Sequence, residues 1–560
     1  MSSAVIGPTA GVRLLLLGAT VAASCRSAPP NPLSPVRVHH QPIVTRIRPA
    51  LPVPEPPPER PDRPNFYFVD RKFAHADRQL QLLDGRPAED VNALGEVPAS
   101  SWWEPRDPTP DEVRRGPPGG RLPVLPLTVE ETKGEGYAVG FFARDAEGRR
   151  FLVKLDAAHT PEVETSGHVV VHRLLWALGY HVPFDHVVEV AREDLRLAEG
   201  AELKRGLVTD PLRPGALDAL LGDAPARRVD GERRYRLLVS EFVSGRPLGG
   251  SPQLGVRRED PNDRIPHQRR RSLRGLGLVA AWLDHWDMKD ANTLDVLVEG
   301  DGGPYVRHLL IDFGKAMGGF GRVDRIPKAG FGHLFELSSL ATGWAALGLR
   351  ARPWERRTVP KLRGVGWFTA QPFDPGAWRA FAPYAPFRSR DPNDDLWAAL
   401  RVARLSPAHV EAAVAAGRYS EDASARTVLS VLLARRQSIL TYAFGRRAPL
   451  DGFHVTADRL CWTDWSARAE LGPTALVGAE IHRFETARGA RVAEVRSVTP
   501  TGRCLPLGLT GGSRAPVYRV ARILASADRV TEVHLIRDGA RTDVVGVVRG
   551  RRDEMAFAHP

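Results

Sequence analysis

Two short alternating runs in the middle of the chain constrain its fold more than any other feature. TLDVLV (293–298) and YVRHLLI (305–311) alternate apolar and polar residues, which is the period of a half-buried strand. The cluster EGDGGP (299–304) between them has the composition of a turn. We therefore predict an antiparallel hairpin in which Thr293 faces Ile311.

Two short oxygen-bearing side chains flank this hairpin. Asn292 precedes the first strand and Asp312 follows the second, so antiparallel pairing brings both to the same end. Amide and carboxylate oxygens are ligands that suit a hard cation such as Mg²⁺. Asn and Asp are also ordinary turn residues, so the spacing alone leaves a structural role open.

The loop before the hairpin, HWDMKDAN (285–292), follows the apolar run RGLGLVAAWLD, which has the composition of a buried helix. Asp287 lies five residues before Asn292. A carboxylate there could accept a proton from a hydroxyl while a metal holds phosphates, and Lys289 could neutralise a transferred phosphate.

Lysine is scarce in this chain, and that scarcity carries information. Of 78 basic residues, 8 are Lys and 70 are Arg, so a basic position is Arg by default. Lys154 and Lys289 therefore indicate sites that need the compact ammonium group. The Arg residues are scattered among Asp and Glu without a basic stripe interleaved with aromatics, so we expect no nucleic-acid partner despite a net charge of +12.

A second hairpin is predicted over residues 129–156. TKGEGYAVGFFAR and RRFLVKLD read as strands, and the cluster 145–148 between them reads as a turn. Pairing of Arg144 near Arg149 puts Lys154 opposite Val139. Three glycines then lie beside or above this lysine: Gly134, Gly136 and Gly140. Backbone amides at glycines can cradle phosphates, although glycines in a hairpin are more often turn residues.

Further helices and strands are predicted from hydrophobic periodicity and from the Gly and Pro residues that end them. Helices are predicted over 161–179, 271–284, 406–417 and 424–444, and a strand with a Gly/Pro hinge over 234–250. After about residue 450, five strand-like runs predict a small β domain: LVGAEIHRF, ARVAEVRSV, VYRVARILA, RVTEVHLIR and RTDVVGVVR. Cys461 and Cys504 could pair outside the cytoplasm.

At this point the sequence resembles a known family. HWDMKDAN resembles the protein-kinase catalytic loop His-Arg-Asp-x-Lys-x-x-Asn, and IDFG (311–314) resembles the Asp-Phe-Gly motif. The resemblance covers roughly residues 129–445. It implies an α+β, bilobal protein-kinase-like fold with a β-rich N-lobe (129–250) and a helical C-lobe (251–445), followed by the β domain at 446–560.

The resemblance also implies cofactors and roles. ATP and Mg²⁺ would be bound, with Lys154 on the α- and β-phosphates. Asp287 would be the base, and Asn292 and Asp312 would hold the metal. The hinge near 240–244 would reach the adenine through its backbone.

Departures from the common pattern point to atypical branches. Trp286 replaces the Arg of the loop, no Ala-Pro-Glu follows Asp312, and the intervening hairpin is long. These features are similar to HipA-type kinases, phosphatidylinositol 3- and 4-kinases and secreted kinases. The carboxylate partner of Lys154 stays open: Glu162 and Glu164 are close in sequence, while the register that best suits the helix offers His168.

The N-terminus predicts export. Residues 1–25 end in an apolar run and Ala-Ala-Ser-Cys, which resembles a lipoprotein lipobox with Cys25 as the lipidated residue; an ordinary cleaved signal is the alternative. Residues 26–64 hold 13 Pro in 39 positions and predict an extended spacer. Residues 65–128 read as an extension packed on the main domain. We expect a lipid-anchored protein of the cell envelope, at the outer membrane or periplasmic face.

Three functions fit these patterns. The first is phosphoryl transfer from ATP to an unknown protein, lipid or sugar acceptor. The second is a tethered binding or scaffold protein with an inactive kinase-like fold. The third keeps the fold but transfers a nucleotidyl group to a protein.

Overall fold

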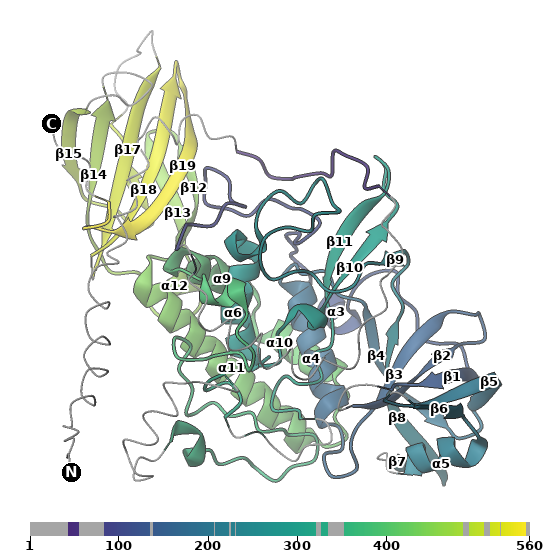
Figure 1. Cartoon of the computed structure of the whole chain (residues 1–560). Helices are drawn as coiled ribbons and strands as arrows, with labels where there is room; N and C mark the ends of the chain where they lie inside the picture. The colour runs from purple at the N-terminus through teal and green to yellow at the C-terminus, as the bar shows by residue number, and fades with distance from the viewer. Residues whose placement is uncertain are drawn as a thin grey trace, which may run out of the picture.

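Helices and strands gather in largely separate parts of the molecule (Figure 1). The computed structural model describes residues 43–54, 83, 85–134, 138–206, 208–222, 226–229, 231–320, 326, 328–333, 352–484, 492–508, 516–526 and 528–555. The chain is mixed α and β with several sheets, which is compatible with the α+β expectation.

The largest sheet is built from the first half of the chain. Its strands run in the order β4-β8-β3-β2-β1-β5-β6, with β7 beside β8. The bounds are β1 (Leu127–Thr132), β2 (Val139–Arg144), β3 (Arg150–Leu155), β4 (Phe184–Ala191), β5 (Leu195–Arg205), β6 (Val208–Pro211), β7 (Ala226–Val229) and β8 (Glu232–Glu241). The predicted hairpin over 129–156 is therefore three strands, β1 to β3, because the chain turns again between Lys133 and Val139.

The register between β2 and β3 differs by one residue from the prediction. Arg144 faces Arg150, so Lys154 faces Gly140 and not Val139. The reason is the turn at Asp145, whose side chain accepts hydrogen bonds from the Glu147 and Arg149 amides at 3.0 and 2.9 Å. Asp145 N also donates to Arg149 O, so Asp145 faces Arg149 in the same register and the turn is 146–148, one residue shorter than predicted.

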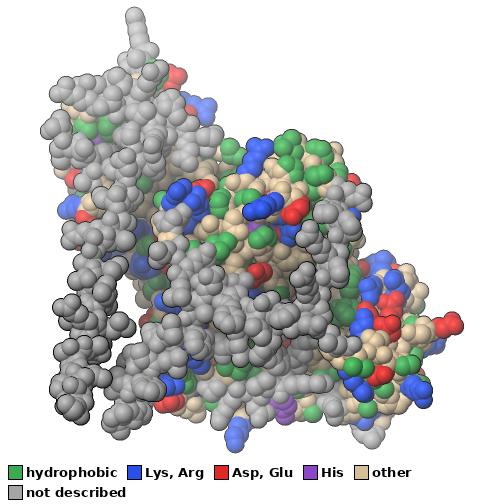
Figure 2. Space-filling view, viewed as in Figure 1, with side chains coloured by type: hydrophobic (Ala, Val, Ile, Leu, Met, Phe, Trp, Pro, Cys, Tyr) green, Lys and Arg blue, Asp and Glu red, His purple; other side chains and the backbone are tan. Residues whose placement is uncertain are grey.

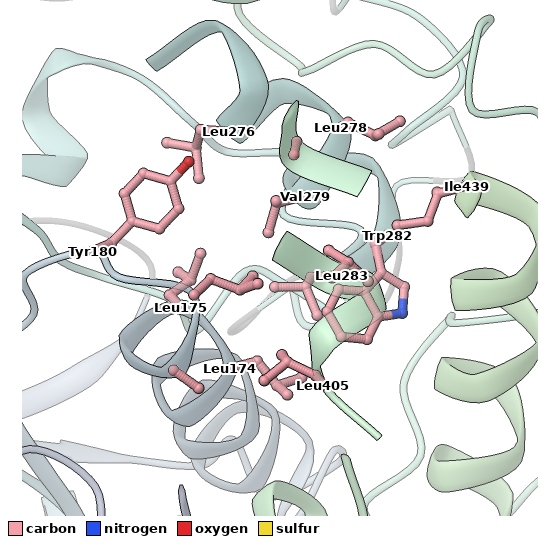
Figure 3. Packing of buried hydrophobic residues seen from close by; sticks show 14 of the residues in the cluster. Leu174, Leu175, Tyr180, Leu276, Leu278, Val279, Trp282, Leu283, Leu405 and Ile439 are labelled. Atoms are coloured by element: carbon pink, nitrogen blue, oxygen red, sulfur yellow. The ribbon is translucent and has the colours of Figure 1, made fainter. Parts of the chain in front are cut away.

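The helices form the centre of the molecule. Their bounds are α3 (Pro110–Arg115), α4 (Val163–Ala177), α5 (Pro214–Gly222), α6 (Arg271–Leu283), α8 (Ala385–Arg388), α9 (Pro392–Arg404), α10 (Pro407–Ala416), α11 (Asp422–Arg446) and α12 (Trp465–Arg468), with 3₁₀ turns η2 (His267–Arg269), η3 (Asp290–Asn292) and η4 (Pro353–Arg356). The four predicted helices are confirmed as α4, α6, α10 and α11. Leu174 and Leu175 of α4 point toward Val279, Trp282 and Leu283 of α6 (Figure 3).

Helix α4 joins the large sheet to the helices, and all of its residues are buried. It follows Glu162, whose φ is 68°, and the chain leaves it through Gly179, whose φ is 105°. Arg236 of β8 donates to Ser166 Oγ in α4 and to Gly417 O after α10, each at 2.7 Å. This buried guanidinium fixes the position of α4 against both neighbours.

The central hairpin is present as β10 (Thr293–Val298) and β11 (Tyr305–Leu310), with β9 (Arg246–Pro247) on the other side of β10. Its register is one residue from the prediction, since Thr293 faces Leu310 and not Ile311. The turn takes up all six residues of 299–304, so Val298 pairs with Tyr305.

The N-terminal part of the structure runs along the surface. Ile47 N donates to Ala99 O at 2.8 Å, and Val53 N donates to Pro304 O at 3.1 Å. Part of the predicted spacer, 43–54, therefore packs on the folded chain, and Trp103 of the extension is buried in the helical core. Cys25 and the rest of the export segment lie outside the described residues. Within the described ranges, no helix has the length and apolarity needed to cross a bilayer.

The C-terminal region is a pair of sheets, and the five predicted strands are confirmed in one of them. That sheet has the order β15-β14-β17-β18-β19, and β12, β13 and β16 form the other. The bounds are β12 (Leu450–Thr456), β13 (Arg459–Asp464), β14 (Leu476–Phe484), β15 (Val492–Val498), β16 (Cys504–Pro506), β17 (Val517–Ala525), β18 (Arg529–Asp538) and β19 (Arg541–Arg551). A disulfide between Cys461 and Cys504 joins β13 to β16.

The surface charge is mixed. On the face drawn in Figure 2, Lys and Arg side chains lie among Asp and Glu over the described surface. On the large sheet, for example, Arg150 makes ion pairs with Glu130 and Glu131.

Candidate functional site

Four segments of the fold bring titratable side chains together. Lys154 lies near the end of β3, Glu164 lies in the first turn of α4, Asp287 lies in the loop after α6, and Asp312 follows β11. The hydrogen bonds and charges that connect them are described in turn.

Lys154 and Asp312 form a direct ion pair, with 2.6 Å between Nζ and Oδ1. The lysine side chain is 5% exposed and the aspartate side chain 39%. Burial disfavours the ammonium, but Asp312 and Glu164 outweigh it and raise the pKa of Lys154. Burial also disfavours the Asp312 carboxylate, yet Lys154 holds its pKa well below the usual range. Both groups are therefore charged at neutral pH.

Glu164 is the carboxylate beside this pair. Burial raises its pKa to about 7, with Lys154 lowering it and Asp312 raising it. A Cβ on Gly314 would lie 2.4 Å from Glu164 Oε1, so the glycine after Phe313 leaves room for this side chain. Glu164 thus sits at the border between its neutral and ionised forms next to two fixed charges.

The other two candidates for that position point elsewhere. Glu162, which immediately precedes α4, accepts hydrogen bonds from Arg363 and Ser420, each at 2.6 Å. His168 Nε2 lies 2.6 Å from Asp185 Oδ2. The choice left open by the sequence is therefore decided in favour of Glu164, although its carboxylate makes no hydrogen bond to Lys154 within the described residues.

Asp287 lies between two lysines. Lys289 Nζ donates to both of its carboxylate oxygens at 3.0 and 2.9 Å, and Lys315 Nζ is 3.2 Å from Oδ2. The loop is held by Trp286, which is buried against aromatic neighbours and whose carbonyl accepts from Phe381 N at 2.7 Å. The residue that departs from the common motif thus acts here as an apolar anchor.

Asn292 is the last residue of η3, and its hydrogen bonds stabilise the same loop. Its Nδ2 donates to Asp287 O at 2.6 Å, and its carbonyl accepts from Ile311 N at 3.0 Å. The second bond carries the β10–β11 ladder one step further, so Asn292 faces Ile311; Asn292 and Asp312 leave the same end of the hairpin, but one residue out of the predicted register. Among the described residues, nothing donates to Asn292 Oδ1 or to Asp312 Oδ2, so both oxygens are available to a cation.

Amide and carboxylate oxygens are ligand types that suit Mg²⁺, and an ion held by these two would need its remaining ligands from phosphates and water. The described part of the chain holds no group of three or more His, Cys, Asp or Glu placed to bind a metal by itself. Any divalent ion here would therefore take many of its ligands from a bound substrate.

Phe313 connects the ion pair to the loop. Its ring lies 5.1 Å from His168 and 5.8 Å from His285, edge to face in both cases. Burial lowers the pKa of His285 to about 4, so this imidazole is neutral. Its ring packs against Phe313.

The structure bears differently on the three glycines that the sequence placed near Lys154. Gly140 lies directly opposite Lys154, and a Cβ there would be 2.3 Å from Val153 O. Gly134 follows the end of β1, and Gly136 lies outside the described residues. At the predicted hinge, Ser240 is paired inside β8 between Leu152 and Asp185, so the segment leaving the sheet begins later than expected.

Two lysines near the site were not assigned from the sequence. Lys315 contacts Asp287, and Lys133 shares the electrostatic environment of Lys154 and Asp312. Burial, and then Lys154, lower the pKa of Lys133. The scarcity of lysine, which singled out Lys154 and Lys289, could also have identified these two residues, because only 8 lysines occur in the chain.

Chemically, the site offers a carboxylate beside two cations, a pair of oxygens for a metal and a buried ammonium. No family model matches the chain, and no match was found among curated proteins. Its function is therefore inferred from these residues and their geometry.

Proposed function

We propose that this protein is an exported, membrane-tethered, kinase-like phosphotransferase that uses ATP and Mg²⁺. The observation that carries the proposal is the convergence of Lys154 and Asp312 from opposite halves of the fold, 158 positions apart, beside the Asp287 loop. The large sheet would act as the N-lobe and helices α6 to α11 as the C-lobe of a bilobal arrangement. Glu164, from α4, supplies the carboxylate that such a site requires.

Each residue has a role in this proposal. Lys154 binds the α- and β-phosphates of ATP, and Asn292 and Asp312 would hold Mg²⁺ through their side-chain oxygens. Bound Mg²⁺ would neutralise phosphate charge. The hydrogen bond from Asn292 to the Asp287 carbonyl keeps the metal-binding and proton-accepting parts of the loop in fixed relation.

Asp287 acts on the acceptor. Its carboxylate takes the proton of the acceptor hydroxyl as the new O–P bond forms and the bond to the ADP oxygen breaks; the proton then passes to solvent. Lys289 and Lys315 stabilise the negative charge of the transferred group. The acceptor is a protein, lipid or sugar hydroxyl, reached at the cell envelope through a lipid anchor on Cys25.

A second function has support of its own. Because two lysines occupy the Asp287 carboxylate, the chain could bind ATP as a scaffold without transferring phosphate. Nucleotidyl transfer differs from phosphoryl transfer only in the phosphorus that is attacked.

The deciding experiment begins with ATP binding. The melting temperature of the protein is measured with and without Mg-ATP, where a ligand at 100 times its Kd stabilises by about 2.7 kcal/mol. Label transfer from γ-³²P ATP supports phosphorylation, and transfer from α-³²P ATP supports nucleotidylation. A shift without any transfer favours the scaffold, and no shift at millimolar Mg-ATP rejects all nucleotide-dependent functions.

A further inference from the structure

A second lysine lies in the same row of the large sheet as Lys154. Lys133 N donates to Gly140 O at 2.8 Å, which continues the β1–β2 ladder one step past the pair of Thr132 and Phe141. Gly140 in turn faces Lys154. Directly opposed residues project to the same face of a sheet, so the two lysine side chains share one face, with Cα atoms about 10 Å apart.

The position between these lysines is kept open by glycine. A side chain at Gly140 would collide with Val153 O, so no side chain fills the space between the two ammonium groups. The next residue in the row, Leu238, packs with Val169 of α4. The lysines therefore project from the face that α4 covers, toward Glu164 and Asp312.

Two more lysines approach from the loop side. Lys289 and Lys315 both contact Asp287, and Lys315 also lies 5.8 Å from the centre of the Trp286 ring. Half of the 8 lysines in the chain thus surround one site: Lys133, Lys154, Lys289 and Lys315.

The printed contacts leave one of these lysines without an ion-pair partner. Lys154 is paired with Asp312, and Lys289 and Lys315 both contact Asp287, so three of the four lysines lie against carboxylates. No carboxylate in the described parts of the chain lies within ion-pair distance of Lys133 Nζ. A half-buried ammonium group without a counter-ion is unfavourable, so the arrangement calls for an anion with several charges.

We propose that Lys133 and Lys315 are further ligand-binding residues, and that together with Lys154 and Lys289 they make the site select ligands with a triphosphate over those with a single phosphate. This inference rests on the proposed function and names the part of the nucleotide that is recognised. Lysine suits the task because its flexible point charge with three donors can follow a phosphate chain, whereas arginine is the default cation of this protein.

The test compares ATP and AMP binding in matched variants. Lys133→Met, Lys315→Met and the control Lys361→Met, which removes an exposed lysine, are titrated with each nucleotide in the presence of Mg²⁺. Loss of one charge-assisted hydrogen bond weakens ATP binding roughly 10- to 100-fold, while AMP binding changes less than about threefold. Lys133→Arg retains most of the ATP affinity because the charge is kept. Unliganded melting temperatures show whether each variant is folded.

Several outcomes would overturn the inference. Unchanged ATP affinity in both methionine variants, or equal losses for ATP and AMP, rejects selection by phosphate number. Inorganic tripolyphosphate is the second probe and separates this inference from the proposed function. Lysine-dependent binding of tripolyphosphate without ATP binding would sink the kinase proposal alone. Normal ATP binding that depends on Asp312 but not on Lys133 or Lys315 would sink only the inference drawn here.

Discussion

Lys154 Nζ lies 2.6 Å from Asp312 Oδ1, so a strand of the large sheet is bonded directly to the segment after the central hairpin. The pair is made of one buried and one partly exposed group. The pair lies beside the Asp287 loop, at the centre of the candidate site. Its role can be tested by substituting either residue.

Asp312→Asn should remove Mg-dependent ATP binding while leaving the backbone unchanged. The φ of Asp312 is 58°, a left-handed conformation that Asn adopts readily. Loss of the carboxylate leaves the Lys154 ammonium without its partner, which costs about 1–2 kcal/mol of stability. Titration with ATP at several Mg²⁺ concentrations and chemical denaturation measure the two effects. Asp301→Asn, an exposed turn substitution, is the control and should change neither.

Asp287→Asn should abolish transfer and keep ATP binding. The amide cannot accept a proton as a carboxylate does, and loss of a general base typically lowers the rate 10²- to 10⁴-fold. The hydrogen bond from Asn292 reaches the backbone of Asp287, so the substitution leaves it in place. Single-turnover transfer of ³²P measures the rate. Equal rates for the variant and the wild type would refute Asp287 as the base.

Glu164 and Glu162 should show opposite effects of pH. The pKa of Glu164, about 7, lies above the ordinary 4.5, so between these values the folded state holds a proton that the unfolded state has released. Stability from this group therefore falls as pH rises from 4.5 to 7. Glu164→Gln removes that loss and should be more stable than wild type at pH 8, by an amount on the order of 3 kcal/mol.

Glu162 provides the matched comparison two residues away. Burial opposes its ionisation, but hydrogen bonds from Ser420 and Arg363 prevail and lower its pKa. Its stabilising effect is present above the ordinary pKa and is lost as pH falls through the lowered value. Glu162→Gln should therefore destabilise the protein at neutral pH. Urea denaturation at pH 5 and pH 8 checks both signs, and shifts in the same direction for the two variants would contradict the assignment.

Gly140→Ala should destabilise the large sheet by about 1–3 kcal/mol, because the new Cβ would overlap Val153 O across the β2–β3 ladder. Gly302→Ala is the control, since nothing lies within 4 Å of a Cβ built there. The denaturation midpoints of the two variants measure the difference. If both variants unfold at the same midpoint, the close approach at Gly140 is not a constraint.

The disulfide gives a test in the C-terminal region. Cys504→Ser should lower the free energy of unfolding by about 2–4 kcal/mol, because the bond constrains a loop of 43 residues in the unfolded chain. Mass spectrometry of the intact protein, with and without reductant, shows whether the bond forms. Free thiols in protein purified from an oxidising compartment would contradict the pairing.

Local elements followed from local patterns. The hairpin formed by 293–298 and 305–310, the loop before it and the four helices appear where periodicity and turn residues predict them. Two registers were wrong by one residue, at Lys154 and at Thr293, because each depends on how many residues its turn consumes. Hydrogen bonds inside the turn at Asp145 settle that number, and composition does not.

The sequence by itself identified the candidate residues of the site: a loop with Asp287, Lys289 and Asn292, a following Asp312 and a strand lysine in a chain that prefers arginine. Only the tertiary structure decided their partners. Glu164, and not Glu162 or His168, faces Lys154 because Arg363, Ser420 and Asp185 hold the other two. Lys133 and Lys315 join the site for the same reason. Such pairings connect segments far apart in the chain, so they depend on packing between elements, which periodicity within one element does not encode.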